Sequence, residues 1–253
     1  MPSSTAVKVS NLTGGYGNEK ILDKLNFEIK AGSFVAIAGP NGSGKSTLLK
    51  YLIHELEAKG SSIMLFDKEI NQMKQKEIAK LISFEGQYIR TSDDFTVSEA
   101  VALGRYAYGD VNSSTSLVEE ALKRVGILHL KDRLITRISG GEFQLAMLAR
   151  TICQNTDILA LDEPVNNLDP NHQLVLLNLL SQLSQEGKTI LCVLHDLNAI
   201  LSHCNECIII KDGTIFSSGK VSEIITAQKV KEIYGIDVQM LENPVTGKKV
   251  ILF

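Results

Sequence analysis

Residues 39–47 read Gly39-Pro40-Asn41-Gly42-Ser43-Gly44-Lys45-Ser46-Thr47 and lie between two regular patterns. A continuous apolar run, 34–38, precedes them, and an apolar pattern with helical spacing, 48–53, follows them. A strand, a glycine-rich loop and a helix in this order predict a P-loop, in which backbone N–H groups surround phosphate oxygens. The motif therefore predicts that the chain binds a nucleoside triphosphate.

The residue types of this loop match the chemistry of phosphate binding. Three glycines, Gly39, Gly42 and Gly44, lack a Cβ and let the backbone pass close to phosphate oxygens. We expect Lys45 to reach the β- and γ-phosphates and Ser46 to offer its hydroxyl to Mg²⁺, beside the positive end of the following helix. The other expected nucleotide contacts in the loop are Asn41, Ser43 and Thr47. A glycine-rich turn before an ordinary helix is the alternative, which is disfavoured because every position of the motif is filled.

The composition limits the class of protein. With Lys plus Arg at 26 and Asp plus Glu at 29, the net charge is −3, which gives no electrostatic reason to expect nucleic-acid binding. No apolar run is long enough to span a bilayer, and residues 1–5 lack the basic and apolar segments of a secretory signal. We therefore predict a cytoplasmic protein whose membrane role, if it has one, comes through a partner.

Cys204 and Cys207 form a Cys-x-x-Cys pair with His203 beside it. A redox or metal site would need a second pair of ligands or a thioredoxin-like context, and the sequence provides neither. The chain's four cysteines are also too few for a disulfide framework in a cytosolic protein. We therefore expect the pair to be structural.

Two kinds of pattern divide the chain. Strand-like runs alternate with helical ones in residues 1–86 and 156–220, whereas residues 87–155 carry helical patterns alone. The later strands are continuously apolar, as in a parallel sheet that is buried on both faces. The tail, 221–253, reads as one or two short helices followed by a hairpin.

These patterns predict an α/β fold in a single domain, a P-loop NTPase with a mixed sheet. We expect residues 1–86 and 156–220 to form the nucleotide-binding core, 87–155 a helical insertion subdomain, and 221–253 a small C-terminal helix–hairpin extension. The predicted strands are 7–12, 25–29, 33–38, 62–65, 82–84, 158–161, 189–194, 207–210, 238–241 and 249–253, and the main predicted helices are 97–103, 117–125, 143–152 and 171–186.

An acidic pair follows the apolar strand 158–161. Because the chain turns at a strand end, the adjacent side chains of Asp162 and Glu163 can both approach one site. We expect Asp162 to bind Mg²⁺, directly or through water, and Glu163 to act as the base that polarises the attacking water. A solvated acidic pair that merely ends a strand is the alternative.

A second glycine pair opens the predicted helix 143–152. Ser139-Gly140-Gly141-Glu142 places a hydroxyl and two bare glycines at a helix N-terminus, where an anion could bind. The P-loop already supplies the γ-phosphate pocket of this chain. The turn therefore either binds another phosphate or is only a well-capped helix start, and the residues alone leave both readings open.

Nearly end to end, the chain resembles the nucleotide-binding subunit of ATP-binding cassette (ABC) transporters. The motifs that carry this resemblance follow in the order typical of that family: the P-loop at 39–47, Gln87, Ile138-Ser139-Gly140-Gly141-Glu142, Asp162-Glu163-Pro164, Asn167-Leu168-Asp169 and His195.

The resemblance implies roles for further residues. Tyr16 would stack on adenine, and Gln87 would touch Mg²⁺ and the attacking water while sensing a membrane partner. Ser139-Gly140-Gly141 would grip the γ-phosphate of ATP bound to a second copy of the chain. Asp169 would connect the two sites, and His195 would contact the γ-phosphate. The expected catalytic residues are Glu163, His195, Gln87 and Lys45, and the expected metal ligands are Ser46, Gln87 and Asp162.

Three segments depart from the usual family pattern. Gln87 follows Glu85-Gly86 instead of an apolar residue and proline. The signature turn begins with Ile138 and ends with Glu142, where leucine and glutamine are commonest, and the aspartate loop begins Asn166-Asn167. None of these departures removes an expected phosphate or metal ligand.

Finer features look like the importers of iron–siderophores, haem and cobalamin. These features are the segment 95–106, the string His195-Asp196-Leu197-Asn198, and the tail with Ile233-Tyr234-Gly235 and Pro244-x-Thr-Gly. This resemblance implies ATP as substrate, Mg²⁺ as cofactor, a dimer around two ATP molecules and a place on the inner face of the membrane. Its partners would be two permease subunits and, indirectly, an extracytoplasmic substrate-binding protein.

Other classes of protein stay open. A soluble ABC-type ATPase that acts on ribosomes, DNA or cluster assembly shares the catalytic motifs, but usually carries two cassettes, long insertions or basic extensions. A scaffold that binds ATP without hydrolysing it would normally lack Glu163 or His195. The ATP-binding subunit of a different ABC transporter class is the third alternative, although exporter cassettes are usually fused to transmembrane helices.

Overall fold

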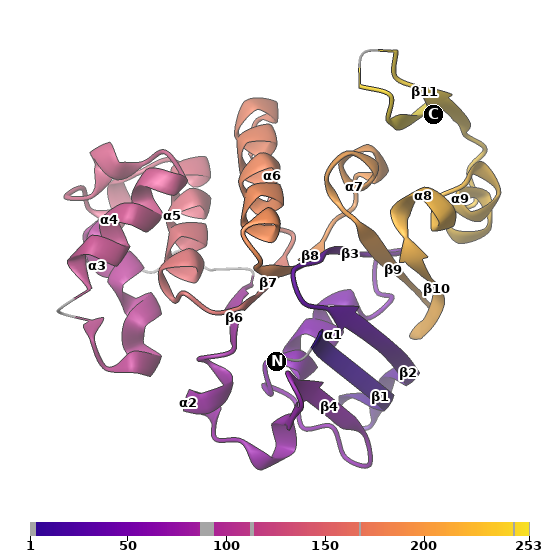
Figure 1. The fold of residues 1–253 in the computed structure, drawn as a ribbon, viewed down its shortest axis with the longest axis horizontal. Coiled ribbons are helices and arrows are strands. Elements are labelled where there is room, and N and C mark those ends of the chain that lie inside the picture. The colour runs from indigo at the N-terminus through magenta and orange to yellow at the C-terminus, as the bar shows by residue number, and fades with distance from the viewer. Residues whose placement is uncertain (1–3, 87–93, 112–113, 167, 245, 253) are drawn as a thin grey trace.

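The computed structural model describes residues 4–86, 94–111, 114–166, 168–244 and 246–252 (Figure 1). Within these residues, six strands form the larger sheet in the order β10-β9-β3-β8-β7-β6. All neighbours in it are parallel except β9 and β10, which pair antiparallel. The bounds are Phe34–Ala38 for β3, Ile82–Glu85 for β6, Ile158–Asp162 for β7, Thr189–Val193 for β8, Glu206–Lys211 for β9 and Thr214–Lys220 for β10.

A smaller antiparallel sheet lies on one side of the larger one, in the order β2-β1-β4-β5. The helix α1, Lys45–Leu52, packs with residues of both sheets in one apolar cluster. The strands of the smaller sheet are β1 at Thr5–Tyr16, β2 at Glu19–Lys30, β4 at Ser62–Leu65 and β5 at Lys68–Glu69. The P-loop helix is therefore buried between two sheets.

The two faces of the larger sheet belong to different cores, as the two-residue period of a strand requires. Along β3, Val35 and Ile37 pack toward α1, whereas Phe34, Ala36 and Ala38 pack toward the helices on the other face. All five residues are fully buried. This two-sided burial explains why the strand reads as a continuous apolar run.

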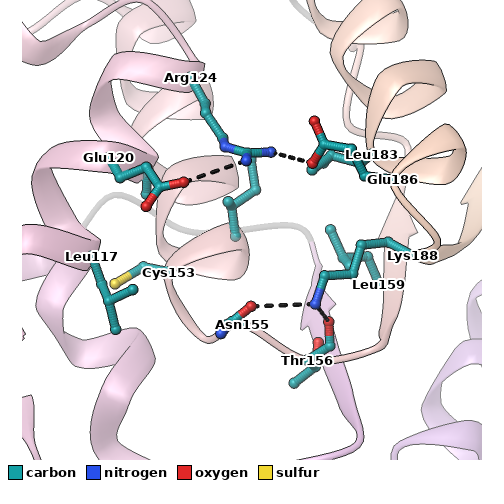
Figure 2. A pocket seen from close by; sticks show the side chains of 12 residues that line it. Leu117, Glu120, Arg124, Cys153, Asn155, Thr156, Leu159, Leu183, Glu186 and Lys188 are labelled. Carbon is teal, nitrogen blue, oxygen red and sulfur yellow. Dashed lines mark hydrogen bonds and ion pairs between the residues drawn. The ribbon is translucent and has the colours of Figure 1, made fainter.

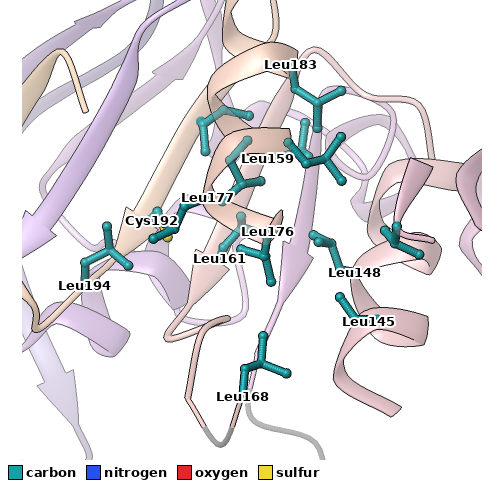
Figure 3. Close-up of a cluster of buried hydrophobic side chains, with 14 of the residues drawn as sticks. Leu145, Leu148, Leu159, Leu161, Leu168, Leu176, Leu177, Leu183, Cys192 and Leu194 are labelled. Carbon is teal, nitrogen blue, oxygen red and sulfur yellow. The ribbon is translucent and has the colours of Figure 1, made fainter. Parts of the chain in front are cut away.

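Helices cover the second face. Between β6 and β7 the chain forms α3, Val97–Ala102, then a 3₁₀ turn, Leu103–Tyr108, and then α4, Thr115–Arg124, and α5, Gly140–Cys153. Figure 1 shows α3, α4 and α5 together at one side of the sheet, with α6, Pro170–Gln185, next to them. In Figure 3, leucines of α5 face leucines of α6 and β7, and all of them belong to one buried cluster.

The C-terminal part begins after β10. It contains α8, Val221–Ile224, and α9, Ala227–Tyr234, followed by the hairpin of β11, Gln239–Glu242, and β12, Lys249–Leu252. The hairpin packs against α7, Leu197–His203, through the buried side chain of Ile251. Short elements elsewhere are 3₁₀ turns at Ile70–Gln72, Leu128–Leu130 and Ile135–Arg137, and the helix α2 at Gln75–Ile78.

The predicted α/β class with a mixed sheet is confirmed, but the prediction contains no strand at β5 or β10, and the other differences lie mainly at element ends. Strand β1 continues to Tyr16, beyond the predicted end at residue 12, and pairs with β2 through several register shifts. Bulges break the alternation on which the prediction depended. Helix α5 begins at Gly140, before the predicted start at residue 143, because Ser139 caps it.

None of the helices in the described ranges combines the length and the apolar character that crossing a bilayer requires.

Candidate nucleotide-binding site

The P-loop connects β3 to α1 in a conformation that depends on its glycines. Gly39, Gly42 and Gly44 have φ angles of +139°, +77° and +102°, in the region that side chains other than glycine rarely adopt. A Cβ on Gly39 would lie 1.9 Å from the carbonyl oxygen of Ile210, and one on Gly44 would lie 2.4 Å from Leu22 Cδ2. The backbone angle therefore favours glycine at all three positions, and close packing requires it at Gly39 and Gly44.

A pocket of about 760 Å³ opens above this loop. The P-loop supplies one wall, and Ile21, Glu163, Asn166 and His195 complete the lining. The P-loop residues in the lining are Asn41, Gly42, Gly44, Lys45, Ser46 and Thr47. The structure thus brings together side chains from β2, the P-loop and the ends of β7 and β8, which lie far apart in the sequence.

Lys45 is 6% exposed, and its ammonium group donates to the backbone oxygens of Gly39 at 2.9 Å and Pro40 at 2.8 Å. Burial lowers the pKa of Lys45, and the nearby carboxylates of Glu163 and Asp162 oppose that shift. Both acceptors of the Lys45 amine are neutral backbone oxygens of the P-loop itself. Phosphate oxygens would be stronger partners for it.

Ser43 contains an orphan polar atom. Its Oγ is buried and has no hydrogen-bond partner among the residues that the structure describes. A buried hydroxyl without a partner is unfavourable by about 1–3 kcal/mol. An acceptor outside the chain, such as a phosphate oxygen in the loop, would relieve this cost, so the residues present fit a bound phosphate chain.

Ser46 and Asp162 meet at the end of β7. The hydroxyl of Ser46 donates to Asp162 Oδ1 at 3.1 Å. Burial raises the pKa of Asp162, while the bond from Ser46 and the charge of Lys45 lower it. Hydroxyl and carboxylate oxygens are the ligands that Mg²⁺ prefers, so the pair fits that ion. No group of three or more His, Cys, Asp or Glu side chains in the described residues could hold a metal, and Mg²⁺ would depend on phosphate oxygens as well.

Glu163 follows directly and has a left-handed backbone, with φ at +56°. This turn directs its side chain into the pocket, where Oε1 lies 2.6 Å from Nε2 of His195. The other carboxylate oxygen accepts a hydrogen bond from Asn166 Nδ2. Asn166 was not predicted as a site residue, although it belongs to the motif that departs from the family pattern. The pair of Glu163 and His195 joins the ends of two parallel strands.

Several predicted residues lie elsewhere. Tyr16 ends β1, is 43% exposed, and has the amine of Lys50 at 5.5 Å from its ring centroid. It is not in the lining of the pocket, and its expected contact with adenine stays a prediction. Gln87 lies outside the described residues.

The turn Ser139-Gly140-Gly141 is also separate from the P-loop pocket. Ser139 caps α5: its hydroxyl accepts from the backbone N–H of Glu142 at 3.3 Å, and the Glu142 carboxylate accepts from the backbone N–H of Ser139 at 2.7 Å. Hydrogen bonds to its carboxylate from the backbone and the side chain of Ser139 lower the pKa of Glu142. Within one chain, the turn is therefore a capped helix start. A phosphate bound there would have to belong to a nucleotide held by another molecule.

Asp169 has a similar position at the start of α6. Its carboxylate accepts from the backbone N–H groups of Asn171 at 3.0 Å and His172 at 3.1 Å, and also contacts the His172 ring. The bonds from His172 lower the pKa of Asp169. Asp169 does not line the P-loop pocket, so its predicted role between two sites is untested within one chain.

The C-terminal part reaches the P-loop through Tyr234, which sequence patterns did not assign to the site. The phenol of this α9 residue lies beside the backbone of Gly39, which opposes the effect of burial on its pKa. Burial raises the pKa of Tyr234 to about 12. The sequence offered no signal for this contact, because residues 39 and 234 are brought together only by the sheet between them.

The Cys-x-x-Cys pair behaves as a structural element. Burial raises the pKa of the Cys207 thiol to about 12 and also raises that of Cys204, so neither is activated as a thiolate. No metal-ligating group in the described ranges includes them.

A second, smaller pocket of about 190 Å³ lies among α4, α5 and α6 (Figure 2). Arg124 of α4 donates to Glu186 at 2.7 Å, just after α6, and pairs with Glu120 at 3.3 Å. Lys188 donates to the Asn155 side chain at 3.2 Å and to the backbone oxygen of Thr156 at 2.7 Å. These bonds connect the helices inserted between β6 and β7 with the rest of the sheet.

Glu85 is a buried acid. In the sequence it is notable only because Glu85-Gly86 precedes Gln87, where the family usually has an apolar residue and proline. It ends β6, and its Oε1 accepts a hydrogen bond from Gln144 of α5 at 2.7 Å. The other carboxylate oxygen is buried and has no hydrogen-bond partner within the described part of the chain. Burial raises its pKa to about 8, against the smaller opposing effects of Arg150 and Gln144.

We expect the Glu85 carboxyl to make folding stability depend on pH. The folded chain holds its proton up to about pH 8, whereas the unfolded chain releases it near the ordinary glutamate pKa of 4.5, so the free energy of unfolding falls as pH rises between these values. Between pH 4.5 and about pH 8, the loss in the free energy of unfolding would be about 5 kcal/mol at most. Urea unfolding of Glu85→Gln at pH 5.5 and pH 8 should give a flatter dependence than the native chain.

Glu99→Gln is the control for that experiment. Hydrogen bonds from Thr96 lower the pKa of this exposed carboxyl, so its titration lies below the window. An unchanged pH slope in Glu85→Gln would show that residue 85 ionises normally in the folded protein.

The chain was compared with known proteins. Residues 22–166 match the family model described as ABC transporter. The ferric enterobactin transport ATP-binding protein FepC of Escherichia coli is 37% identical over 256 aligned residues, which cover 99% of this chain and 94% of that protein. The iron(3+)-hydroxamate import ATP-binding protein FhuC of Bacillus subtilis is 35% identical, with 94% and 91% covered. A solved dimeric ATP-binding cassette in a post-hydrolysis state with ADP and Pi has a TM-score of 0.76 at 27% identity, with 85% and 98% covered.

Proposed function

As a member of the ABC transporter family, this chain binds and hydrolyses ATP, and we propose that it is the motor subunit of an importer for ferric siderophores. The observation that carries the proposal is the pocket in which Lys45, Glu163 and His195 meet above the P-loop. The names of relatives that match nearly the whole chain, for ferric enterobactin and iron(3+)-hydroxamate, support the substrate class.

The geometry of the pocket supports a separate role for each group of residues in it. The P-loop amides and Lys45 would hold the β- and γ-phosphates, with the Ser43 hydroxyl as a further donor. Ser46 and Asp162 would hold Mg²⁺, which neutralises phosphate charge when it is bound. The core of residues 1–86 and 156–220 would thus carry the chemistry.

Glu163 is the proposed general base. Its carboxylate projects into the pocket from a strand end and can accept a proton from a water molecule there. His195 holds one of its oxygens at 2.6 Å. A γ-phosphate would offer His195 a second acceptor, so ATP and Glu163 would compete for the same imidazole.

The second half of the site would come from another copy. Ser139-Gly140-Gly141 presents a helix N-terminus that points to no phosphate site of its own chain. Two chains in head-to-tail contact would each add this turn to the partner's P-loop pocket, with Asp169 between the sites. Closure around ATP and reopening after hydrolysis would give the cycle its direction.

A groove on the helical segment fits a membrane partner. It has a volume of about 450 Å³ and lies between α3, the following 3₁₀ turn and α4. Phe95 and Leu103 line it while they are 40% and 41% exposed. Exposed apolar side chains in a groove are typical of a docking site for a helix. A permease on the inner face of the membrane would use this groove.

We expect Phe95→Asp to uncouple transport from ATP hydrolysis. A charge placed in the groove should lower permease binding at least tenfold, because an unpaired carboxylate is costly to bury in an apolar contact. The test uses proteoliposomes with the cognate permeases and binding protein, and measures uptake of iron as ferric enterobactin and as a ferric hydroxamate.

Phe216→Asp is the matched control, since Phe216 is 37% exposed but lies on β10, at the edge of the larger sheet away from α3 and α4 (Figure 1). Normal uptake with Phe95→Asp would contradict the docking site. Uptake of haem or cobalamin, with no uptake of either siderophore, would contradict the proposed substrate class.

A further inference from the structure

His195 lies in the short connection between β8 and α7, and α7 in turn contacts the C-terminal hairpin. Strand β8 ends at Val193, and α7 begins at Leu197 with Asp196 as its cap. The Asp196 carboxylate accepts from the backbone N–H of Asn198 at 2.8 Å. The direction of the His195 side chain therefore depends on how α7 sits on the sheet.

Asn198 joins α7 to β12 by two hydrogen bonds. Its Nδ2 donates to the backbone oxygen of Ile251 at 3.0 Å, and the backbone N–H of Ile251 donates to its Oδ1 at 2.7 Å. The amide thus occupies both polar groups of one strand residue, as a neighbouring strand would. A side chain that satisfies donor and acceptor together has a well-defined orientation.

Further contacts make this junction rigid. Ile251 is 2% exposed and belongs to the same apolar cluster as Leu197 and Ile200 of α7. At the other end of α7, the amine of Lys248 donates to the backbone oxygen of Ser202. The hairpin therefore contacts α7 at both ends, and the helix is fixed between the sheet and the tail.

We propose that Asn198 is a positioning residue, through which the C-terminal hairpin fixes α7 and so holds His195 in register with Glu163. The inference rests on the proposed function, in which His195 contacts the γ-phosphate. The hairpin then affects catalysis, because it helps to position His195 through α7. The bonds from Asn198 to Ile251, together with the Asp196 cap, form a continuous path from β12 to His195.

The test measures steady-state ATP turnover and nucleotide affinity of the purified full-length chain. Asn198→Ala should lower kcat by about 10- to 100-fold, because a catalytic group displaced by about 1 Å loses rate on that scale. The KM for ATP should change less than about threefold, since the P-loop contacts stay in place. Asn198→Asp, which keeps the acceptor for the Ile251 N–H, should recover part of the loss.

Asn26→Ala is the matched control. The Asn26 side chain also makes two bonds to backbone, accepting from Asn11 at 2.9 Å and donating to Lys24 at 2.7 Å, but it lies on β2. The Asn26→Ala variant should lose as many side-chain hydrogen bonds as Asn198→Ala and keep normal ATP turnover. Faster hydrogen exchange at Ile251 in Asn198→Ala will establish that the hairpin has been released.

A double-mutant cycle distinguishes a positioning role from a structural one. If Asn198 acts through His195, then Asn198→Ala should have no further effect on turnover in a His195→Ala background. If the losses of turnover in the two single variants multiply in the double variant, the inference is overturned. Normal turnover in Asn198→Ala with a released hairpin would overturn it as well. Normal turnover in His195→Ala would overturn the inference together with the proposed role of His195, whereas a loss confined to His195→Ala would overturn the inference alone.

Discussion

Glu163→Gln is expected to lower ATP turnover by about 100-fold or more while ATP still binds. Removal of a general base costs about 10²- to 10⁴-fold, and the amide cannot accept the proton of the attacking water. The Gln side chain has the same size and can still contact His195 and Asn166, so the pocket should keep its shape. Release of Pi and retention of labelled ATP would be measured on the same preparation.

The variant should also accumulate as a closed dimer with ATP, because the step that reopens the dimer is blocked. Size-exclusion chromatography with and without ATP will detect it. Glu186→Gln is the control, since Glu186 is also a carboxylate in contact with a nitrogen of a basic side chain, that of Arg124, but lies outside the P-loop pocket. Normal turnover in Glu163→Gln would remove Glu163 as the base.

Ser139→Arg should abolish turnover while each chain still binds one ATP. The Ser139 turn is not in the lining of the P-loop pocket of its own chain, so nucleotide binding to a monomer should be unaffected. In the proposed dimer, the arginine would displace a donor from the partner's γ-phosphate, and the loss of one such donor costs about 100-fold or more. Titration with labelled ATP and Pi release would be compared.

Loss of the helix cap must be separated from loss of the shared site. Thr226→Arg is the matched control, because Thr226 caps α9 with a bond of 3.3 Å to Lys229, the same length as the cap bond of Ser139. Mixing Ser139→Arg with Lys45→Ala chains supplies a sharper test. A mixed dimer contains one intact P-loop opposite one intact Ser139 turn, so turnover should partly return. No recovery on mixing, or loss of ATP binding in the single variant, would contradict a site shared between copies.

Some structural features could be predicted because they are local. The P-loop requires glycine by backbone angle alone, and Gly39, Gly42 and Gly44 carry that requirement in the sequence. Continuous apolar strands indicated a sheet that is buried on both faces, and β3, β7 and β8 are fully buried along their length. The α/β class and the division between strands and helices followed from these periods.

Other features depend on which strand ends lie together. Nothing near Glu85 in the sequence indicates that its carboxyl is buried against α5, where Gln144 is its one hydrogen-bond partner among the described residues. That contact depends on the packing of a helix far along the chain. In the sequence, Asn198 is notable only as the last residue of a string that resembles the importer group, and nothing there indicates a contact with the tail. It becomes a junction only because the last strand of the chain folds back onto α7.

The sequence by itself determined the triphosphate loop, the acidic strand end and most of the alternation of strands and helices along the chain, because each is encoded by residues that are close together in the sequence. Only the tertiary structure decided that Glu163 meets His195 at 2.6 Å and that the Ser139 turn lies apart from the pocket of its own chain. Parallel strands align their carboxyl ends at one sheet edge whatever their separation in the chain, so side chains far apart in sequence converge there. Which of them meet is set by strand order and packing, and these are properties of the folded chain.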